Sequence, residues 1–306
     1  MRVIVLMSCF KGVAYVEQQI GSILAQLPAE GRLIVRDDGS PDDTVAAIMR
    51  AADTRVTLVR GDNIGFARSF LWLIENAPAD AEMVMLADQD DVWLPDKVER
   101  AWRVLGSAQK PTLYCSRQQL VDVRLQPLGL SPCWPRPPSF LNALTENIVT
   151  GCTAAFNGAA LELLRHNGDA SRIHFHDWWL YLVVSARGEV VFDPEPTMLY
   201  RQHAGNVIGM ADGFRRQLHI LRFLRTHDWI HMLFNQVVNL RAVHGASLTP
   251  AQRELLDRRF DPRSPLAITR LVLWPRRLRQ TWFGDFAFRG LLLFNLVRGR
   301  GLLPKS

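Results

Sequence analysis

Two clusters of aspartates follow short apolar segments and have the residue types needed to bind a cation. They are Arg36-Asp-Asp-Gly-Ser40 and Ala87-Asp-Gln-Asp-Asp91. Carboxylates that converge repel one another, and Mg²⁺, which prefers one or two carboxylates together with substrate phosphates, would relieve that repulsion. A single Asp-Asp-Gly-Ser segment is also a common turn and helix cap. Two such clusters after two apolar segments favour a ligand site over two unrelated turns.

The elements that would position these clusters alternate between strand and helix over the first 110 residues. Segments with helical spacing separate apolar runs at Val3–Met7, Leu33–Val35, Val56–Val59, Met83–Leu86 and Thr112–Tyr114. This alternation predicts an α/β fold, Rossmann-like, with a mostly parallel central sheet. In open sheets of that kind, ligands bind beyond the carboxyl ends of the strands, and both clusters fall at such ends.

The remainder of the chain is less regular. We expect a long surface loop over Arg124–Phe140, strands over Thr150–Phe156 and Val190–Phe192, a helix over His176–Ala186, and an edge strand at Met198–Tyr200. Residues 214–244, 249–259 and 264–298 have helical spacing. The domains expected are a sheet-containing part, residues 1–209, and a helical part, residues 210–306.

Charge is distributed unevenly between these two parts. Residues 210–306 contain 17 Lys and Arg against 6 Asp and Glu, whereas the net charge of the whole chain is only +6. Arginines alternate with Trp, Phe and Leu in the helical part, a pattern typical of helices that lie in a membrane interface. A helical bundle that packs on the first domain, or on a second subunit in a homo-oligomer, has the same pattern. No nucleic-acid-binding module is recognisable, so we expect no nucleic-acid partner.

Composition excludes several other classes of protein. Hydrophobic residues make up 48% and charged residues 22% of the chain, as in folded globular proteins. The four cysteines, Cys9, Cys115, Cys133 and Cys152, form no Cys-x-x-Cys pair, which argues against a disulfide framework and a structural zinc site. The first apolar run is too short for a signal peptide, and no stretch approaches the roughly 18 apolar residues of a spanning helix. We therefore expect a cytoplasmic location, with the inner face of the cell membrane as the surface that the basic part would contact.

A series of motifs, in order, resembles the family-2 glycosyltransferases, which have the GT-A fold. The motifs are Ser8-Cys-Phe10, Glu17-Gln-Gln-Ile-Gly-Ser-Ile-Leu24, Arg36-Asp-Asp-Gly-Ser-Pro-Asp-Asp-Thr44, Asn63-Ile-Gly-Phe-Ala67, Ala87-Asp-Gln-Asp-Asp-Val-Trp93, Gly151-Cys-Thr153, His176-Asp-Trp-Trp179 and Tyr200-Arg-Gln-His203. The resemblance covers about residues 1–208. Three of these motifs together resemble bacterial rhamnosyltransferase-like members most: Asp88-Gln-Asp-Asp-Val-Trp93, His176-Asp-Trp-Trp179 and Tyr200-Arg-Gln-His203.

The resemblance implies a donor site for a nucleotide sugar. Asp38 would bind the base of the donor, with Ser8 and Phe10 lining the same pocket, and Asp88 would lie near the ribose. Arg201 could reach the diphosphate, where a guanidinium suits phosphate oxygens, or could be a surface salt-bridge partner.

The resemblance also implies a divalent cofactor, Mn²⁺ or Mg²⁺. Asp90 would bind the metal that bridges the diphosphate, with Asp91 assisting. His203 corresponds to a late histidine that completes the metal shell in related enzymes, although a single histidine is often structural. An imidazole ligand suits Mn²⁺ better than Mg²⁺.

The acceptor side is implied by the motif around Asp177, which would be the catalytic base. An ordinary aspartate, with a pKa of about 3.9, is ionised at neutral pH and can accept the proton of an acceptor hydroxyl. The same residue, at the start of a helix, could be only an N-cap. Trp178 and Trp179 beside it would either pack against acceptor sugar rings or belong to the core.

The function expected is transfer of a sugar, with inversion, from a nucleotide donor to a surface-polysaccharide or lipid-linked glycan acceptor. L-rhamnose from dTDP-rhamnose is the sugar and donor that the closest resemblance implies. The first motif, Ser8-Cys-Phe-Lys-Gly12, departs from the Thr-Tyr-Asn-Gly of many members, which leaves the donor base open. The Gln-x-x-Arg-Trp element of processive members is absent, so a single addition is expected. The alternatives are a nucleotidyltransferase and a non-catalytic scaffold that binds sugar nucleotides.

Overall fold

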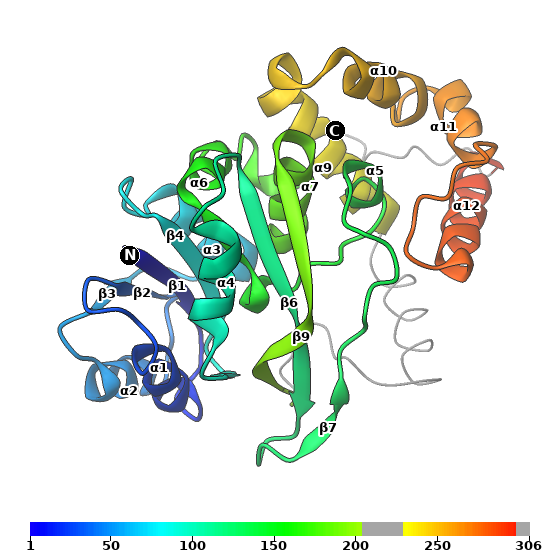
Figure 1. Cartoon of the computed structure of the whole chain (residues 1–306). Coiled ribbons are helices and arrows are strands. Elements are labelled where there is room, and N and C mark those ends of the chain that lie inside the picture. The colour runs from blue at the N-terminus through cyan, green and yellow to red at the C-terminus, as the bar shows by residue number, and fades with distance from the viewer. Residues whose placement is uncertain (204–228, 298–306) are drawn as a thin grey trace.

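The computed structural model describes residues 1–203 and 229–297. The predicted domain boundary after residue 209 and the first part of the predicted helix 214–244 lie outside the described residues. All strands of the described part join one sheet, which Figure 1 shows at the centre of the molecule.

One half of the sheet is parallel, as the sequence predicts. It consists of β1 (Val3–Cys9), β2 (Arg32–Asp37), β3 (Val56–Arg60) and β4 (Met83–Asp88), in the spatial order β3-β2-β1-β4. β1 pairs on both sides, with β2 and with β4, and every residue from Val3 to Met7 is buried. A strand that is covered on both faces needs a continuous apolar run, which is what the sequence has there.

Alternate residues of the central strands contribute to two separate cores. Val3, Val5 and Met7 pack with α1 (Val16–Leu24), α2 (Thr44–Ala51) and α4 (Lys97–Leu105). Ile4 and Leu6 point the other way and pack with α3 (Phe66–Glu75), α6 (Gly158–Leu164) and α7 (His176–Arg187). Helices therefore cover both faces of the sheet, as in other α/β proteins (Figure 1).

The second half of the sheet is mixed and differs from the expectation. Its strands are β5 (Val92–Trp93), β6 (Thr112–Val121), β7 (Pro127–Leu130), β8 (Ala155–Asn157) and β9 (Glu189–Arg201). The two short strands predicted at Val190–Phe192 and Met198–Tyr200 are one continuous strand, and it is not an edge strand because it pairs with both β6 and β5. The pairing of β6 with β9 shifts register opposite Pro194 and Pro196, because prolines lack the amide hydrogen that a regular ladder needs.

Two further segments differ from the expected loop and strand. The predicted loop Arg124–Phe140 contains β7, and its last residue begins the short helix α5 (Phe140–Ala143). The predicted strand Thr150–Phe156 begins instead with a turn of 3₁₀ helix, η1 (Gly151–Thr153), and only its end joins β8. A second 3₁₀ turn, η2 (Ala170–Arg172), precedes α7.

The C-terminal part is helical, as expected, and packs beside α7. It comprises α9 (Trp229–His244), the 3₁₀ turn η3 (Gly245–Ser247), α10 (Pro250–Arg259), α11 (Pro265–Val272) and α12 (Trp282–Val297). The single helix predicted over 264–298 is wrong, since α11 and α12 are separate. Pro275 lies between them and cannot continue a helix, and the Asp285 carboxylate accepts hydrogen bonds from the backbone N–H groups of Leu278 and Arg279 in the connection. In the part of the chain that the structure describes, no helix is long and apolar enough to cross a membrane.

Candidate functional site

The aspartate clusters meet at one edge of the sheet, as the sequence predicts. Ser8 of β1 lies opposite Asp88 of β4, and Cys9 lies opposite Asp37 of β2. The backbone N–H of Asp38 donates to the carbonyl of Cys9, which holds the second cluster against the first strand. Parallel pairing places the carboxyl ends of these strands together, so the two clusters share one site although about 50 residues separate them in sequence.

Asp88 and Asp91 form the inner part of this acidic site. Their carboxylate oxygens and the sulfur of Cys152 all lie within 4.8 Å of one another. Burial, together with the charge of Asp90, raises the pKa of Asp88 to about 7 and raises the pKa of Asp91 above its ordinary value. Asp91 is 1% exposed, and its Oδ2 atom has no hydrogen-bond partner among the described residues. Close, buried carboxylates of this kind are the environment in which a cation is stabilising.

Asp90 lies in direct contact with His203. The Nε2 atom of the histidine is 2.7 Å from Oδ2 of the aspartate, although 113 residues separate them. The imidazole ring also stacks on Tyr15, with 5.5 Å between the ring centroids. The structure thus brings together two of the three residues that the sequence suggested as metal ligands.

The donor atoms fit a divalent metal, and they fit best on the Asp90 side of the site. Carboxylate oxygens and one imidazole nitrogen are ligands that Mn²⁺ accepts. The Cys152 side is less suitable, because burial raises the pKa of its thiol and keeps it protonated, whereas metals bind the thiolate. Asp90 and His203, with Asp88 beside them, are therefore the residues that would hold the metal.

A buried lysine, which the sequence analysis did not single out, supports the acidic site. The side chain of Lys97 is fully buried, and its Nζ atom donates to the carbonyl of Cys152 at 3.0 Å. Burial lowers its pKa to about 8, although the charges of Asp91 and Asp88 oppose that shift. The signal was present, because Lys97 lies four residues before Ala101 on the apolar side of α4.

Arg201 is a buried residue, so the surface role considered for it is wrong, whereas its contact with a diphosphate stays a prediction. It is 2% exposed, so it is no surface residue. Its backbone N–H donates to Asp91 Oδ1, and its guanidinium donates to the carbonyls of Asp90 and Val123 and to Gln18 Oε1. These bonds clamp the loop that carries the acidic residues. A buried guanidinium with these partners therefore orders the loop that carries the predicted metal ligands.

The residues expected around the donor base lie at the same edge but differ in exposure. Phe10 is 38% exposed, which leaves its ring open to a ligand, and Ser8 is partly buried with its Oγ atom 2.6 Å from Oγ of Ser69. Asp38 is 2% exposed, pairs with Arg36 and accepts hydrogen bonds from the backbone N–H groups of Ile64 and Gly65. Asp38 therefore orders the loop beside the site, and its contact with a base stays a prediction.

A glutamine between the two site aspartates fastens the first loop to the acidic loop. Gln89 accepts a hydrogen bond from the N–H of Phe10 at 2.8 Å and donates to the carbonyl of the same residue at 2.9 Å. Gln19 of α1 donates to the carbonyl of Asp88 from the other side. Sequence reasoning missed both glutamines, because neutral polar side chains have no signature of their own.

Asp177 occupies the first turn of α7, close enough to Asp88 for its charge to affect that carboxylate. Its Oδ2 accepts the N–H of Gly151 at 3.3 Å, and its Oδ1 accepts the N–H of Trp178 at 2.7 Å. Burial raises its pKa to about 6 despite these hydrogen bonds and one from Asn147, so the ordinary pKa assumed from the sequence is wrong. A carboxylate with this pKa is mostly ionised at neutral pH and is a stronger base than an ordinary aspartate.

The residue before Asp177 is a buried, neutral histidine. His176 stacks on Phe70 with 4.2 Å between the centroids, and neither ring nitrogen has a partner among the described residues. Burial lowers its pKa to about 3, so it contributes no charge beside the carboxylate. The low polarity of this environment is consistent with the raised pKa of Asp177.

Trp178 and Trp179 belong to the core, so the prediction that they contact an acceptor is wrong for this structure. They are 3% and 0% exposed. The indole N–H of Trp178 donates to the carbonyl of Ala143, and that of Trp179 donates to Oδ1 of Asn167. Rings that are covered on both sides and hydrogen-bonded within the protein present no face to a sugar.

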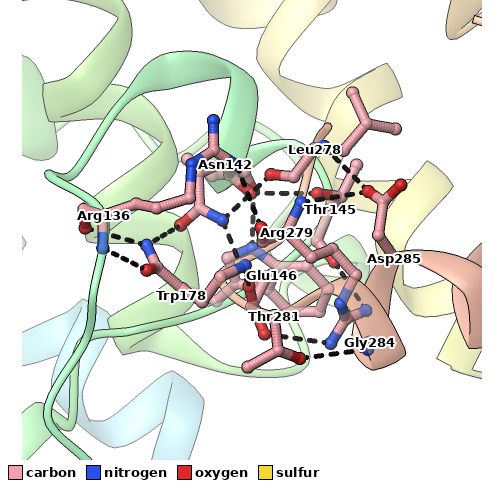
Figure 2. Close-up of polar contacts among 12 residues, drawn as sticks. Arg136, Asn142, Thr145, Glu146, Trp178, Leu278, Arg279, Thr281, Gly284 and Asp285 are labelled. Atoms are coloured by element: carbon pink, nitrogen blue, oxygen red, sulfur yellow. Dashed lines mark hydrogen bonds and ion pairs between the residues drawn. The ribbon is translucent and has the colours of Figure 1, made fainter. Parts of the chain in front are cut away.

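The C-terminal part is hydrogen-bonded to the segment that supports Asp177, as Figure 2 shows. Arg279 donates to the carbonyl of Thr145 at 3.0 Å and lies 3.3 Å from Glu146. Asn142 donates to the carbonyl of Leu278 in the same network. The next residue after Glu146 is Asn147, which bonds to Asp177, so the network reaches the predicted base.

Comparison with known proteins agrees with this arrangement. The chain is 25% identical over 256 residues to dTDP-rhamnosyl transferase RfbG of Shigella flexneri, with 77% of this chain and 84% of that protein covered. Among solved structures, S. aureus TarS 1–349 in complex with UDP-GlcNAc superposes with a TM-score of 0.55 at 14% identity, covering 99% of this chain and 88% of that one. The mannosyltransferase PcManGT of Pyrobaculum calidifontis, in complex with GDP-Man and Mn²⁺, superposes with a TM-score of 0.50 at 18% identity, covering 98% and 88%.

The structural neighbours have the GT-A fold, so the predicted fold is confirmed. The family description Glycosyl transferase family 2 matches residues 4–162, which contain both aspartate clusters and most strands of the sheet. The chain is therefore a member of glycosyl transferase family 2 and a glycosyltransferase.

Proposed function

We propose that the protein is an inverting, metal-dependent glycosyltransferase that moves L-rhamnose from dTDP-rhamnose to a surface-polysaccharide or lipid-linked glycan acceptor. The observation that carries the metal and the reaction is the contact between Asp90 and His203 at the sheet edge that also holds Asp88. The similarity to a dTDP-rhamnosyl transferase over most of the chain supports the donor.

Each residue has a role that follows from its surroundings. A divalent metal bound by Asp90 and His203 would offset the negative charge that develops on the departing nucleoside diphosphate. Arg201 and Gln89 hold the loop that bears the ligands in place. The exposed ring of Phe10 provides a surface on which the donor base can stack.

Asp177 acts on the acceptor. The acceptor oxygen attacks the anomeric carbon, the bond from that carbon to the diphosphate oxygen breaks, and the hydroxyl proton passes to Asp177. The N–H groups of Gly151 and Trp178 orient the carboxylate for this transfer. Because attack and departure occur on opposite sides of the anomeric carbon, the configuration inverts.

Slow hydrolysis of the donor tests this proposal without knowledge of the acceptor. The purified chain is incubated with dTDP-, UDP- and GDP-sugars in Mn²⁺ or EDTA, and nucleoside diphosphate release is measured by chromatography. We expect release from dTDP-rhamnose in Mn²⁺ and at least a hundredfold less from Asp90→Ala. Asp80→Ala, which removes an exposed carboxylate before β4, is the matched control. Release from a different sugar nucleotide would show that this nucleotide, and not dTDP-rhamnose, is the donor. No release from any of them would favour a non-catalytic scaffold.

A further inference from the structure

Helix α12 has apolar side chains on the side that faces away from the described part of the protein. Only Asp285, Phe288 and Leu292 of this helix are buried. Its exposed apolar residues are between 48% and 78% exposed, and they are Trp282, Phe283, Phe286, Leu293, Phe294 and Val297. We refer to these six residues as the α12 face. Figure 1 shows the helix at the periphery of the molecule, away from the sheet.

The helical spacing places the α12 face on one side. Trp282, Phe286, Leu293 and Val297 follow one another at intervals of four, seven and four residues, and Phe283 and Phe294 flank them. No charged residue lies within this face. Large exposed apolar patches are uncommon on monomeric proteins and mark contacts with a protein or a membrane.

The polarity of the helix is inverted relative to an ordinary amphipathic surface helix. Its only acidic residue, Asp285, is 3% exposed, points inward and pairs with Arg289. Arg289 also donates to the carbonyls of Val272 and Trp274, which joins α12 to the end of α11. Since these polar contacts hold the inner side in place, the apolar side remains outward.

The sequence segment that carries the α12 face is basic, and one of its arginines lies against the face. Residues 262–297 contain six arginines, and Asp285 is their only acidic residue. Arg270 and Arg276 are exposed, and the guanidinium of Arg277 lies 4.9 Å from the ring centre of Trp282. Arginines beside Trp, Phe and Leu are the composition with which helices lie at the boundary of an anionic bilayer.

We propose that the α12 face binds the surface of a membrane that contains anionic lipids. Trp282 and the phenylalanines would enter the acyl boundary, while Arg270, Arg276 and Arg277 meet the lipid phosphates. A second copy of the chain fits less well, because a two-fold contact through this face would bring the arginines of both copies together without acidic partners. This inference goes beyond the proposed function and does not depend on it.

The bound membrane would have a fixed orientation to the catalytic part. The connection before α12 donates from Gln280 to Glu146 at 2.6 Å and accepts from Asn142, and both belong to the segment next to Asn147 and Asp177 (Figure 2). The face therefore cannot turn freely with respect to the predicted base. An acceptor held at a membrane would be presented from a constant direction.

Vesicle co-sedimentation tests this inference with the full chain. Vesicles of phosphatidylcholine alone are compared with vesicles that contain phosphatidylglycerol, in low and high salt. We expect binding to the anionic vesicles, weakened by salt, and little binding to neutral ones. The double variant Phe283→Ser/Phe286→Ser should bind at least tenfold more weakly, and Arg270→Gln/Arg276→Gln should lose most of the dependence on anionic lipid.

The matched control is Met49→Ser, which removes a side chain that is 60% exposed on α2, and it should bind like the unchanged chain. Thermal unfolding verifies that each variant is folded. Equal binding of the Phe283→Ser/Phe286→Ser variant would overturn the inference, as would equal binding to neutral vesicles. No vesicle binding, together with a dimer that the same double variant dissociates, would also overturn it and assign the face to a second copy.

Discussion

At the scale of single residues, the activity of the site depends on the pH at which each carboxylate becomes protonated. Asp177 is partly buried beside a neutral histidine, and burial raises its pKa to about 6. A base works only when it is deprotonated, so the fraction of active enzyme rises as the pH increases through about 6. Acceptor transfer should therefore have an acidic limb that an ordinary aspartate, with a pKa near 3.9, would not produce.

The pH profile of transfer at saturating donor and Mn²⁺ checks this. We expect the rate to fall about tenfold per pH unit well below pH 6, because the ionised fraction of Asp177 decreases by about that factor. Asp177→Asn should lower the rate by roughly 10²–10⁴-fold at every pH, with thermal stability unchanged or higher because a buried charge is removed. A rate that stays constant from pH 7 to pH 5 would contradict the assignment.

Gly151 gives a second test at the same scale. Its N–H bonds to Asp177, and a Cβ atom there would lie 2.5 Å from Nε2 of His176. We predict that Gly151→Ala moves the histidine ring and, with it, the start of α7, so that the rate falls at least tenfold while donor binding persists. The comparison is Gly21→Ala on α1, where a Cβ atom meets nothing within 4 Å. Equal rates for the two variants would show that Gly151 has no positioning role.

The sequence could predict individual site residues only in part. Asp88, Asp90 and Asp177 lie in motifs that resemble a family. The structure places Asp88 and Asp90 at one edge of the sheet, and Asp177 is close enough to affect the pKa of Asp88. The role of Arg201 was not predictable, because it depends on carbonyl groups from three separate segments that only the folded chain brings together. The burial of Trp178 and Trp179 was not predictable either, because an aromatic residue at the start of a helix gives the same sequence pattern whether it faces solvent or the core.

At the scale of elements, the connection between α11 and α12 braces the segment that carries Asn142 to Asn147. The Arg279 guanidinium bonds to Thr145 and Glu146 and lies 4.9 Å from the ring centre of Trp229. Pro275 and the inward Asp285 shape this connection, and neither effect is visible in the helical spacing from which one long helix was predicted. Local periodicity predicts helices well, but it does not show where tertiary hydrogen bonds interrupt them.

Arg279→Met tests the brace. We expect a loss of about 1.5–3 kcal/mol in the free energy of unfolding, since Glu146 keeps its charge but loses its charged partner. Transfer should fall as well, because the segment that holds Asn147 against Asp177 is loosened. Urea denaturation measures the stability, and Arg258→Met, which removes an exposed ion pair on α10, is the control and should change it by less than 1 kcal/mol. A similar effect of both variants would mean that Arg279 contributes no more than a surface ion pair.

At the scale of the whole molecule, the chain combines an acidic site at a sheet edge with a basic helical part. The charges and apolar runs of the sequence predict such a division, but they do not predict the order of the strands in the sheet. The sequence could not predict the contact between Asp90 and His203. These residues follow the ends of β4 and β9 and are 113 residues apart in sequence, so only the folded sheet brings them together. The mixed second half of the sheet, with its shifted register, could not be predicted from the alternation of strand and helix segments in the sequence.

Binding of nucleotide and metal to the unchanged chain is the decisive measurement for a metal-dependent donor site at the sheet edge. Melting temperatures are recorded with dTDP, UDP and GDP and the corresponding sugar nucleotides, each with Mn²⁺ or EDTA, because a ligand that binds only the native state raises the melting temperature. We expect a rise with dTDP or dTDP-rhamnose in Mn²⁺ that disappears in EDTA and in Asp90→Ala. A rise of equal size in EDTA, or no rise with any nucleotide in the folded chain, would contradict a metal-dependent donor site at Asp90 and His203.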